Sequence, residues 1–362
     1  MQTKIPCVLM RGGTSKGPFF KASDLPDDPV LRDQVLIAAM GSPDARQIDG
    51  VGGANPLTSK VAIVKRSERN GVDLDYLFVQ VVVDEPRASI KQNCGNMLAG
   101  VGAFAVQEGM IEARGDETTL TVFMENSGSL ADVTFATPGG QPEYDGDARI
   151  DGVPGTASPV MTNFRGTEGS TCGALLPTGN LLDTVNGIEV TCIDNGMPCV
   201  IFEASAVGRT GYESRDDLNA DAELKKIVEA LRLEVGPMMN LQDVGSLTVP
   251  KMTLVAPPRN GGSITTRSFI PHDCHAAIGV FAAVSVATAC IMEGSTASRV
   301  ATIPDGERKM FSMEHPTGEM SVEMEFEGSA EAPVIKRAAL LRTARRLFEG
   351  QILVSDSIWK NA

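Results

Sequence analysis

Positive charge is too scarce in this sequence for a nucleic-acid partner. Its 46 acidic residues outnumber its 32 lysines and arginines, and the formal net charge is −14 at pH 7. Proteins that bind nucleic acids need a basic face that neutralises phosphates, and no basic stripe is present. A small anionic substrate is still allowed, because a few local cations and helix ends can dominate the field in one pocket.

Long apolar segments and paired cysteines are also lacking. The longest uninterrupted apolar run, 276–291, is too short and too rich in Ala, Gly and Ser for a membrane span. Met1–Ile5 has no signal-peptide core and leads straight into a predicted strand. The seven cysteines form no CxxC pair and are odd in number, which favours reduced thiols. We therefore expect a cytoplasmic protein that does not contact membranes.

Nucleotide, metal and serine chemistry each lack their motif. The donor-rich turn Arg11–Gly17 has the wrong residue order for a P-loop. The letters GxGxxA at 100–105 lie inside a predicted helix, which excludes a dinucleotide site. His272–His275 lacks the spacing of metal ligands, and three histidines without a nucleophile elbow do not indicate a serine triad. We expect no cofactor and no metal ion.

What is present is a chain of two similar halves. The length of 362 residues favours two domains, and 42% hydrophobic with 22% charged residues is typical of globular proteins. Thr58–Val64 is paralleled by Val249–Val255, and Ile90–Cys94 is paralleled by Ile270–Cys274. Both cysteines precede a run that is rich in Ala and Gly.

Each half is predicted to be a mostly antiparallel sheet wrapped around a central helix of small residues, in an α+β fold with the active site in the cleft between the halves. We place the boundary near residue 183, which gives domains 1–183 and 184–362, with the final strand able to return to the first domain. Helices are predicted at 24–40, 95–106 and 221–238. Strands are predicted at 5–10, 61–64, 77–83, 119–123, 131–137, 148–153, 189–193, 199–202, 249–255, 320–326, 338–341 and 351–354, the last two around a turn at 349–350. A helix over 340–347 is the alternative for this last segment.

Two residues carry candidate chemistry. Cys94 follows the predicted strand Leu77–Val83 and directly precedes the predicted helix Gly95–Val106. The N–H groups and dipole of a helix N-terminus favour negative charge, which suits a thiolate or a bound carboxylate, although a thiol that merely packs is the alternative. Lys60 directly precedes the apolar predicted strand Val61–Val64. A lysine at such a position either extends into solvent or is held in a pocket.

Four motifs together resemble the aconitate/methylaconitate isomerase family, which has the diaminopimelate epimerase-like fold. The resemblance covers essentially the whole chain, and two further passages are similar to the branch of the family that acts on oxalomesaconate in aromatic-acid degradation. The motifs are the segments 10–17, 93–96, 151–156 and 315–318, and the two passages are 40–50 and 268–272.

The resemblance implies an isomerase that shifts a proton within a small unsaturated polycarboxylate, by tautomerisation or allylic isomerisation and without a cofactor. The proton carriers it implies are Lys60 and Cys94, whose interval of 34 residues (94 − 60) agrees with the family. Which of them acts as base is left open. The residues expected to bind the substrate are Arg11, Thr14, Ser15, Ser59, Asn93, Gly95, Asn96, Asn195, His272 and Cys274.

Three alternatives stay open at this point. The same family includes isomerases of methylaconitate and aconitate. Epimerases of the same fold use two opposed cysteines, and Cys274 is expected at the N-terminus of the second central helix, opposite Cys94. The chain could also bind a carboxylate without catalysis. The sequence is compatible with a homodimer and does not specify one.

We predict that the implied activity survives exhaustive removal of metal ions and needs no added pyridoxal phosphate or nicotinamide. The reason is that proton transfer between side chains needs no redox or Lewis-acid group. Turnover is measured before and after dialysis against a chelator. Full loss that one divalent ion restores would contradict the prediction and direct attention to His272–His275.

Overall fold

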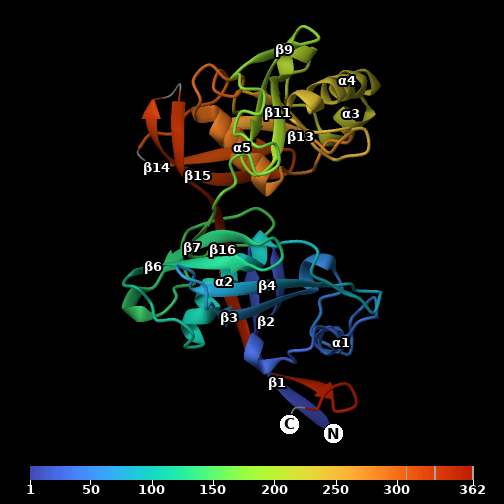
Figure 1. Cartoon of the computed structure of the whole chain (residues 1–362), viewed down its shortest axis with the longest axis vertical. Coiled ribbons are helices and arrows are strands. Elements are labelled where there is room, and N and C mark those ends of the chain that lie inside the picture. Colours follow the sequence, from blue (N-terminus) through green and yellow to red (C-terminus); the bar gives the residue numbers. More distant parts are fainter. Residues whose placement is uncertain (307, 330–331, 361–362) are drawn as a thin grey trace. The chain divides into compact units, whose positions relative to one another are not determined.

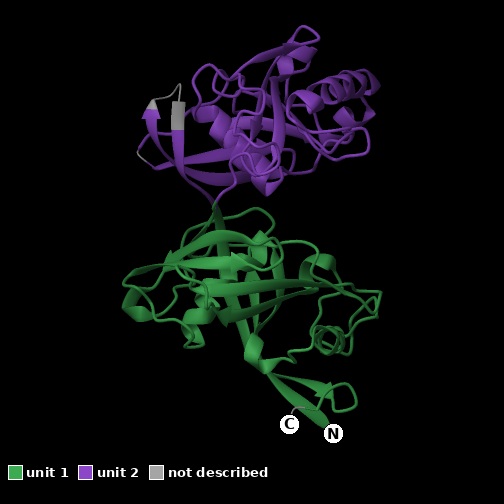
Figure 2. Ribbon diagram, viewed as in Figure 1, with its two compact units in different colours: residues 1–165, 341–362 green, residues 166–340 purple. Residues whose placement is uncertain are grey.

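The chain is organised as two compact units. The computed structural model describes residues 1–306, 308–329 and 332–360. Unit 1 comprises 1–165 with 341–362, and unit 2 comprises 166–340 (Figure 2). The first division therefore follows Arg165 rather than residue 183. The segment 166–182 belongs to unit 2 because hydrogen bonds tie it there. The Gly169 N–H, for example, donates to the Asp194 carbonyl at 2.7 Å.

Unit 1 is a closed barrel (Figure 1). Its strands are hydrogen-bonded in the order β1-β2-β3-β4-β6-β7-β8-β16, and β16 pairs again with β1, which closes the barrel. Two neighbouring pairs, β2 with β3 and β4 with β6, are parallel. The strands are β1 (Gln2–Gly12), β2 (Ser15–Lys21), β3 (Lys60–Arg66), β4 (Leu74–Val81), β6 (Glu117–Met124), β7 (Ser129–Ala136), β8 (Pro159–Phe164) and the final part of β16 (Ala332–Ser355), with the short β5 (Ala88–Ser89) beside β4.

Helix α2 (Gly95–Gln107) lies inside this barrel and contacts β1, β2, β3, β4, β7 and β8. All residues from Met97 to Val106 are buried. Helix α1 (Pro29–Met40) packs on the outside, begins after the capping carboxylate of Asp28 and ends at Gly41, whose φ is 78°. Its predicted start at residue 24 was too early, because a separate 3₁₀ turn, Ala22–Asp24, precedes it.

The barrel holds a helix because small residues face it at the tightest contacts. A Cβ atom on Gly12 would lie 2.4 Å from the carbonyl oxygen of Asn96 in the first turn of α2. A Cβ atom on Gly102 of the helix would lie 2.4 Å from the ring of Phe135. The Ala/Gly composition of this helix is therefore a consequence of packing density.

Unit 2 is an open sheet that packs against helix α5 (Val280–Ile291). The helix contacts β10, β11, β14 and β15, and a second layer of helices packs through a hydrophobic cluster. No helix that the structure describes combines the length and apolar character needed to cross a bilayer. The strand order is β9 (Asp183–Val185), β10 (Ile188–Asp194), β11 (Pro198–Glu203), β12 (Lys251–Ala256), β13 (Ile264–Phe269), β14 (Arg308–His315), β15 (Gly318–Ser329) and the first part of β16. The second layer of helices consists of α3 (Arg215–Ala220) and α4 (Ala222–Met238), and a 3₁₀ turn spans Ala204–Val207. Two further 3₁₀ turns, Pro56–Thr58 and Pro138–Gly140, belong to unit 1.

The predicted α+β class, with mostly antiparallel sheets and a helix against each, is confirmed. Two predictions about strands are wrong. The segment 148–153 forms no strand beyond an isolated bridge between Ala148 and Ala157, since its Gly and Pro residues favour turns. No turn interrupts β16 at Gly350, because this residue pairs in register with Cys7.

We predict that Gly12→Ala lowers the free energy of unfolding by at least about 2 kcal/mol, because the added methyl overpacks the contact with α2. Gly279→Ala is the comparison, since its nearest neighbour would lie 3.9 Å away; its effect should stay within about 1 kcal/mol. Urea denaturation followed by circular dichroism measures both. Equal stability of Gly12→Ala and wild type would contradict the packing argument.

Candidate active site

Lys60 and Cys94 lie side by side at one end of α2. Cys94 is the N-cap residue of the helix and is 6% exposed, while Lys60 is the first residue of β3. The Lys60 Nζ lies 3.4 Å from the Cys94 Sγ and 5.4 Å from the centre of the Phe78 ring. The structure thus brings the two predicted proton carriers into direct contact. A thiol beside an ammonium group at a helix N-terminus is a recognised setting for a reactive cysteine.

The backbone of Cys94 is fixed by two donors. The Leu98 N–H donates to its carbonyl oxygen at 3.1 Å as the first helical bond. The Tyr76 hydroxyl, which is fully buried, donates to the same oxygen at 3.2 Å. Burial raises the pKa of Tyr76, and the nearby charge of Cys94 raises it further, so the hydroxyl stays a neutral donor.

Hydrogen bonds from two glutamine side chains hold the start of β3. Gln47 is 1% exposed, and its Nε2 donates to the Ser59 hydroxyl at 2.7 Å. That hydroxyl in turn donates to the Val81 carbonyl at 2.8 Å, and the Gln80 side chain donates to the Ser59 carbonyl at 2.8 Å. The Ser59 hydroxyl is therefore already engaged in positioning Lys60, while its predicted contact with substrate stays a prediction.

The turn between β1 and β2 packs against the first turn of α2. Asn96 Nδ2 donates to the Thr14 hydroxyl at 3.0 Å. The Arg11 guanidinium donates to the Gly13 and Thr343 carbonyls, at 2.9 and 3.0 Å, so it supports the turn. Within the described residues the buried Ser15 hydroxyl has no hydrogen-bond partner. An unpartnered buried hydroxyl close to Cys94's helix is a candidate contact for a ligand.

Three predicted site residues belong to unit 2 and are described within it. Asn195 is 1% exposed, and its amide donates to Thr288 of α5 at 2.9 Å, so it ties a turn to that helix. His272 is exposed, with Nδ1 3.5 Å from Glu229. Among the described residues no three His, Cys, Asp or Glu side chains are arranged to hold a metal ion.

The placement of Cys274 corrects an expectation. Helix α5 starts at Val280 after the N-cap residue Gly279, so Cys274 is not at a helix N-terminus. It pairs with Phe269 in an isolated bridge, and its thiol belongs to the hydrophobic cluster beneath α3 and α4. Burial raises its pKa to about 11. The prediction from the internal repeat failed because the two halves differ in the distance from cysteine to helix. Cys94 is itself the N-cap of α2, whereas five residues separate Cys274 from the N-cap Gly279 (279 − 274).

Sequence reasoning missed Arg342. This residue of β16 is 8% exposed, and among the described residues its guanidinium makes one hydrogen bond, from Nη1 to the Leu341 carbonyl at 2.7 Å. Burial lowers its pKa to about 10, opposed by the charge of Cys94, so the guanidinium is still protonated at neutral pH. Period-two alternation along β16, which places Arg342, Ala344 and Arg346 on one face, is the signal that could have found it.

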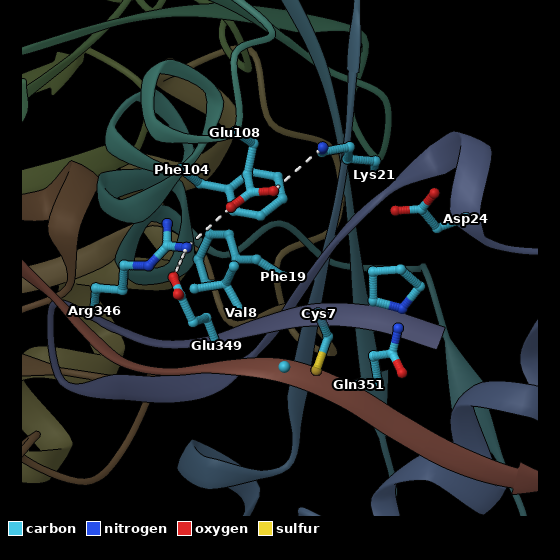
Figure 3. Close-up of a pocket in the computed structure, with 12 residues that line it drawn as sticks. Cys7, Val8, Phe19, Lys21, Asp24, Phe104, Glu108, Arg346, Glu349 and Gln351 are labelled. Carbon is cyan, nitrogen blue, oxygen red and sulfur yellow. Dashed lines mark hydrogen bonds and ion pairs between the residues drawn. The ribbon is translucent and has the colours of Figure 1, made fainter. Parts of the chain in front are cut away.

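A pocket of about 460 Å³ lies at the other end of α2 (Figure 3). Three of its charged groups form a network, since Glu108 lies 3.2 Å from Lys21 and 3.0 Å from Arg346. Burial raises the pKa of Asp24, which also lines the pocket. Its thiol, Cys7, has a pKa raised to about 11 by burial. Lys21 is thus paired with a carboxylate here, whereas Lys60 contacts a thiol at the opposite end of the helix.

The chain is similar to known isomerases over nearly its whole length. A family model described as PrpF protein matches residues 2–355. The chain is 60% identical over 349 residues to a (4E)-oxalomesaconate Delta-isomerase of Novosphingobium sp. (strain KA1), covering 96% of this chain and 97% of that protein. It is 57% identical over 358 residues to a 4-oxalomesaconate tautomerase of Pseudomonas putida (strain KT2440), covering 99% and 98%. A crystal structure of methylitaconate-delta-isomerase superposes with a TM-score of 0.90 at 33% identity, over 100% of this chain and 98% of that one.

We predict that Cys274→Ser keeps at least a tenth of the wild-type kcat, a barrier change below about 1.4 kcal/mol. The thiol packs in a core cluster, and a serine hydroxyl can still donate to the His275 carbonyl that the thiol contacts at 3.5 Å. Turnover per folded molecule is compared with that of Cys94→Ser. A loss as deep as that of Cys94→Ser would mean that both cysteines carry protons.

Proposed function

The chain belongs to the PrpF protein family, and on that premise we propose that it is an isomerase that moves a proton within 4-oxalomesaconate, converting the keto form into the enol form. The observation that carries the proposal is the 3.4 Å contact between Lys60 and Cys94. The two relatives named above that act on oxalomesaconate match nearly the whole chain, which supports the same substrate here.

The reaction needs one group that removes an acidic proton beside a carbonyl and one that returns a proton elsewhere on the same molecule. The electron pair of the broken C–H bond delocalises into the conjugated carbonyl system as a dienolate, and protonation of a distal atom completes the shift. Nothing is oxidised or reduced. Lys60 and Cys94 are adjacent, so a planar substrate above them meets both groups on one face.

Charge develops on the substrate oxygens in the dienolate. Helix α2 points its N-terminus at this position, where backbone N–H groups and the helix dipole stabilise negative charge. The Ser15 hydroxyl, for which the described residues supply no partner, and the nearby Thr14–Asn96 pair support a role in binding. Asn93 and Gly95, which flank Cys94 in the chain, are proposed to contribute as well. Arg11 contributes through the turn that it supports, because its Nη1 is engaged by backbone carbonyls.

An allylic shift of the carbon–carbon double bond is the second candidate reaction. It uses the same pair of proton carriers, and one of the two relatives that act on oxalomesaconate is named a Delta-isomerase. Methylaconitate and aconitate are the alternative substrates. An epimerase reaction gains no support, because Cys274 packs in a hydrophobic cluster. We further propose a cytoplasmic location, consistent with seven unpaired thiols among the described residues.

We predict that Lys60→Ala and Cys94→Ala each lower kcat by roughly 10²–10⁴ while the fold is kept, since each removes a proton carrier. Lys65→Ala is the matched control, because Lys65 lies on the same strand with its side chain 52% exposed. It should retain wild-type turnover. Near-normal turnover of purified Lys60→Ala would end the proposed mechanism.

The assay uses ultraviolet absorbance and proton NMR on a panel of 4-oxalomesaconate, (4E)-oxalomesaconate, 2-methylaconitate and 3-methylitaconate. Absorbance follows keto–enol conversion, and NMR in D₂O distinguishes it from migration of the double bond. We expect the highest kcat/KM with 4-oxalomesaconate. Turnover of a methylated substrate alone would replace the proposed substrate, and no turnover on the panel would favour a carboxylate-binding protein.

A further inference from the structure

Arg342 is a buried cation for which the part of the chain that the structure describes supplies no anionic partner. It is 8% exposed, and within the described residues its guanidinium forms no ion pair and only one hydrogen bond, to the carbonyl of its own neighbour Leu341. A guanidinium carries five N–H donors, and a buried charge is strongly disfavoured unless it is paired. The fold therefore leaves a positive charge that an anion can satisfy.

The strand register places this side chain toward the N-terminal end of α2. Ala344 pairs with Gly12 of β1, and Gly12 touches the first turn of α2 at Asn96. Directly opposed residues of paired strands point to the same side, and so do residues two apart on one strand. Arg342 therefore shares the helix-facing side of β16 with Ala344. On the other side of β16, β8 brings Phe164 against Gly95 of the helix.

Arg346 provides an internal contrast on the same face of the same strand. Its guanidinium lies 3.0 Å from Glu108 and also pairs with Glu349 (Figure 3). It donates a further hydrogen bond to the Gln107 side chain. It sits at the C-terminal end of α2, where it neutralises a carboxylate that the helix dipole disfavours. Carboxylates of the protein thus neutralise one inward arginine, and no described carboxylate neutralises the other.

We propose that Arg342 binds a carboxylate of the substrate beside Cys94 and thereby fixes the reacting carbon over the Lys60–Cys94 pair. The proposal rests on the function proposed above. The planar guanidinium fork accepts a carboxylate through two parallel hydrogen bonds, so it orients the bound molecule as well as holding it. The charge of Cys94 acts on Arg342, which is consistent with their proximity.

The test compares Arg342→Gln and Arg342→Lys with wild type, and uses Arg345→Gln as the matched control. Arg345 is the outward neighbour on the same strand, with its side chain 52% exposed. With 4-oxalomesaconate, we expect KM to rise at least about tenfold in Arg342→Gln and less in Arg342→Lys, while kcat falls less than KM rises. Arg345→Gln should match wild type.

A second readout does not depend on turnover. Tricarballylate, a saturated tricarboxylate, should protect Cys94 from alkylation by the neutral reagent iodoacetamide, and half-protection should need at least about tenfold more of it in Arg342→Gln. This shift is expected even if the chain isomerises no substrate on the panel, which separates the two proposals. Equal protection in Arg342→Gln and wild type, or none in wild type, would overturn the role of Arg342.

Two further outcomes decide between a ligand-binding and an internal role. Thermal unfolding of Arg342→Met should occur at or above the wild-type temperature, because an unpaired buried charge is removed. A markedly lower unfolding temperature would show that the fold itself needs Arg342 and would overturn the proposal. Slower alkylation of Cys94 in Arg342→Gln without added anion, with KM unchanged, would mean that the thiolate is the partner and would also overturn it.

Discussion

Helix α2 can lie inside the barrel of unit 1 only where small residues meet at the contact. Gly12 on β1 and Gly102 on the helix leave no room for a side chain, so the strands approach the helix backbone closely. The close approach fixes the position of the helix N-terminus. Cys94 is then held by Tyr76 from β4 and meets Lys60 from β3, and the first turn of the helix also anchors the turn at Thr14. The candidate site depends on this one packing constraint.

Electrostatics follow from the same arrangement. The chain as a whole carries a formal charge of −14, yet the groups gathered at the N-terminal end of α2 include Lys60, Arg342 and the positive end of the helix dipole. At the C-terminal end, Glu108 is neutralised by Lys21 and Arg346. The net charge led us to expect no nucleic-acid partner, but it has no bearing on which ion one pocket attracts, since local geometry decides that.

The sequence could predict the parts of this site that depend on local pattern. A strand, a polar turn and a small-residue helix are recognisable within a few residues, so the position of Cys94 at the start of α2 is confirmed. Contacts between residues that are far apart in the sequence could not be predicted. The segment 166–182 was predicted to belong to the first domain, but its hydrogen bonds to Asp194 assign it to unit 2. Cys274 lies five residues before the N-cap of α5, because the second half has a longer segment between the cysteine and the helix. Arg342 looks like one of many strand arginines until its lack of a carboxylate partner among the described residues is known.

The proposed proton shift requires Lys60 and Cys94 to act as one catalytic unit, and a double-mutant cycle tests this requirement directly. The rate of proton exchange between 4-oxalomesaconate and D₂O is measured for wild type, Lys60→Ala, Cys94→Ala and the double variant. If the two groups serve a single proton shift, the double variant loses no more than about threefold beyond the worse single variant, because the second substitution removes nothing that still functions. A loss equal to the product of the two single losses would show that the residues act independently and would contradict the account.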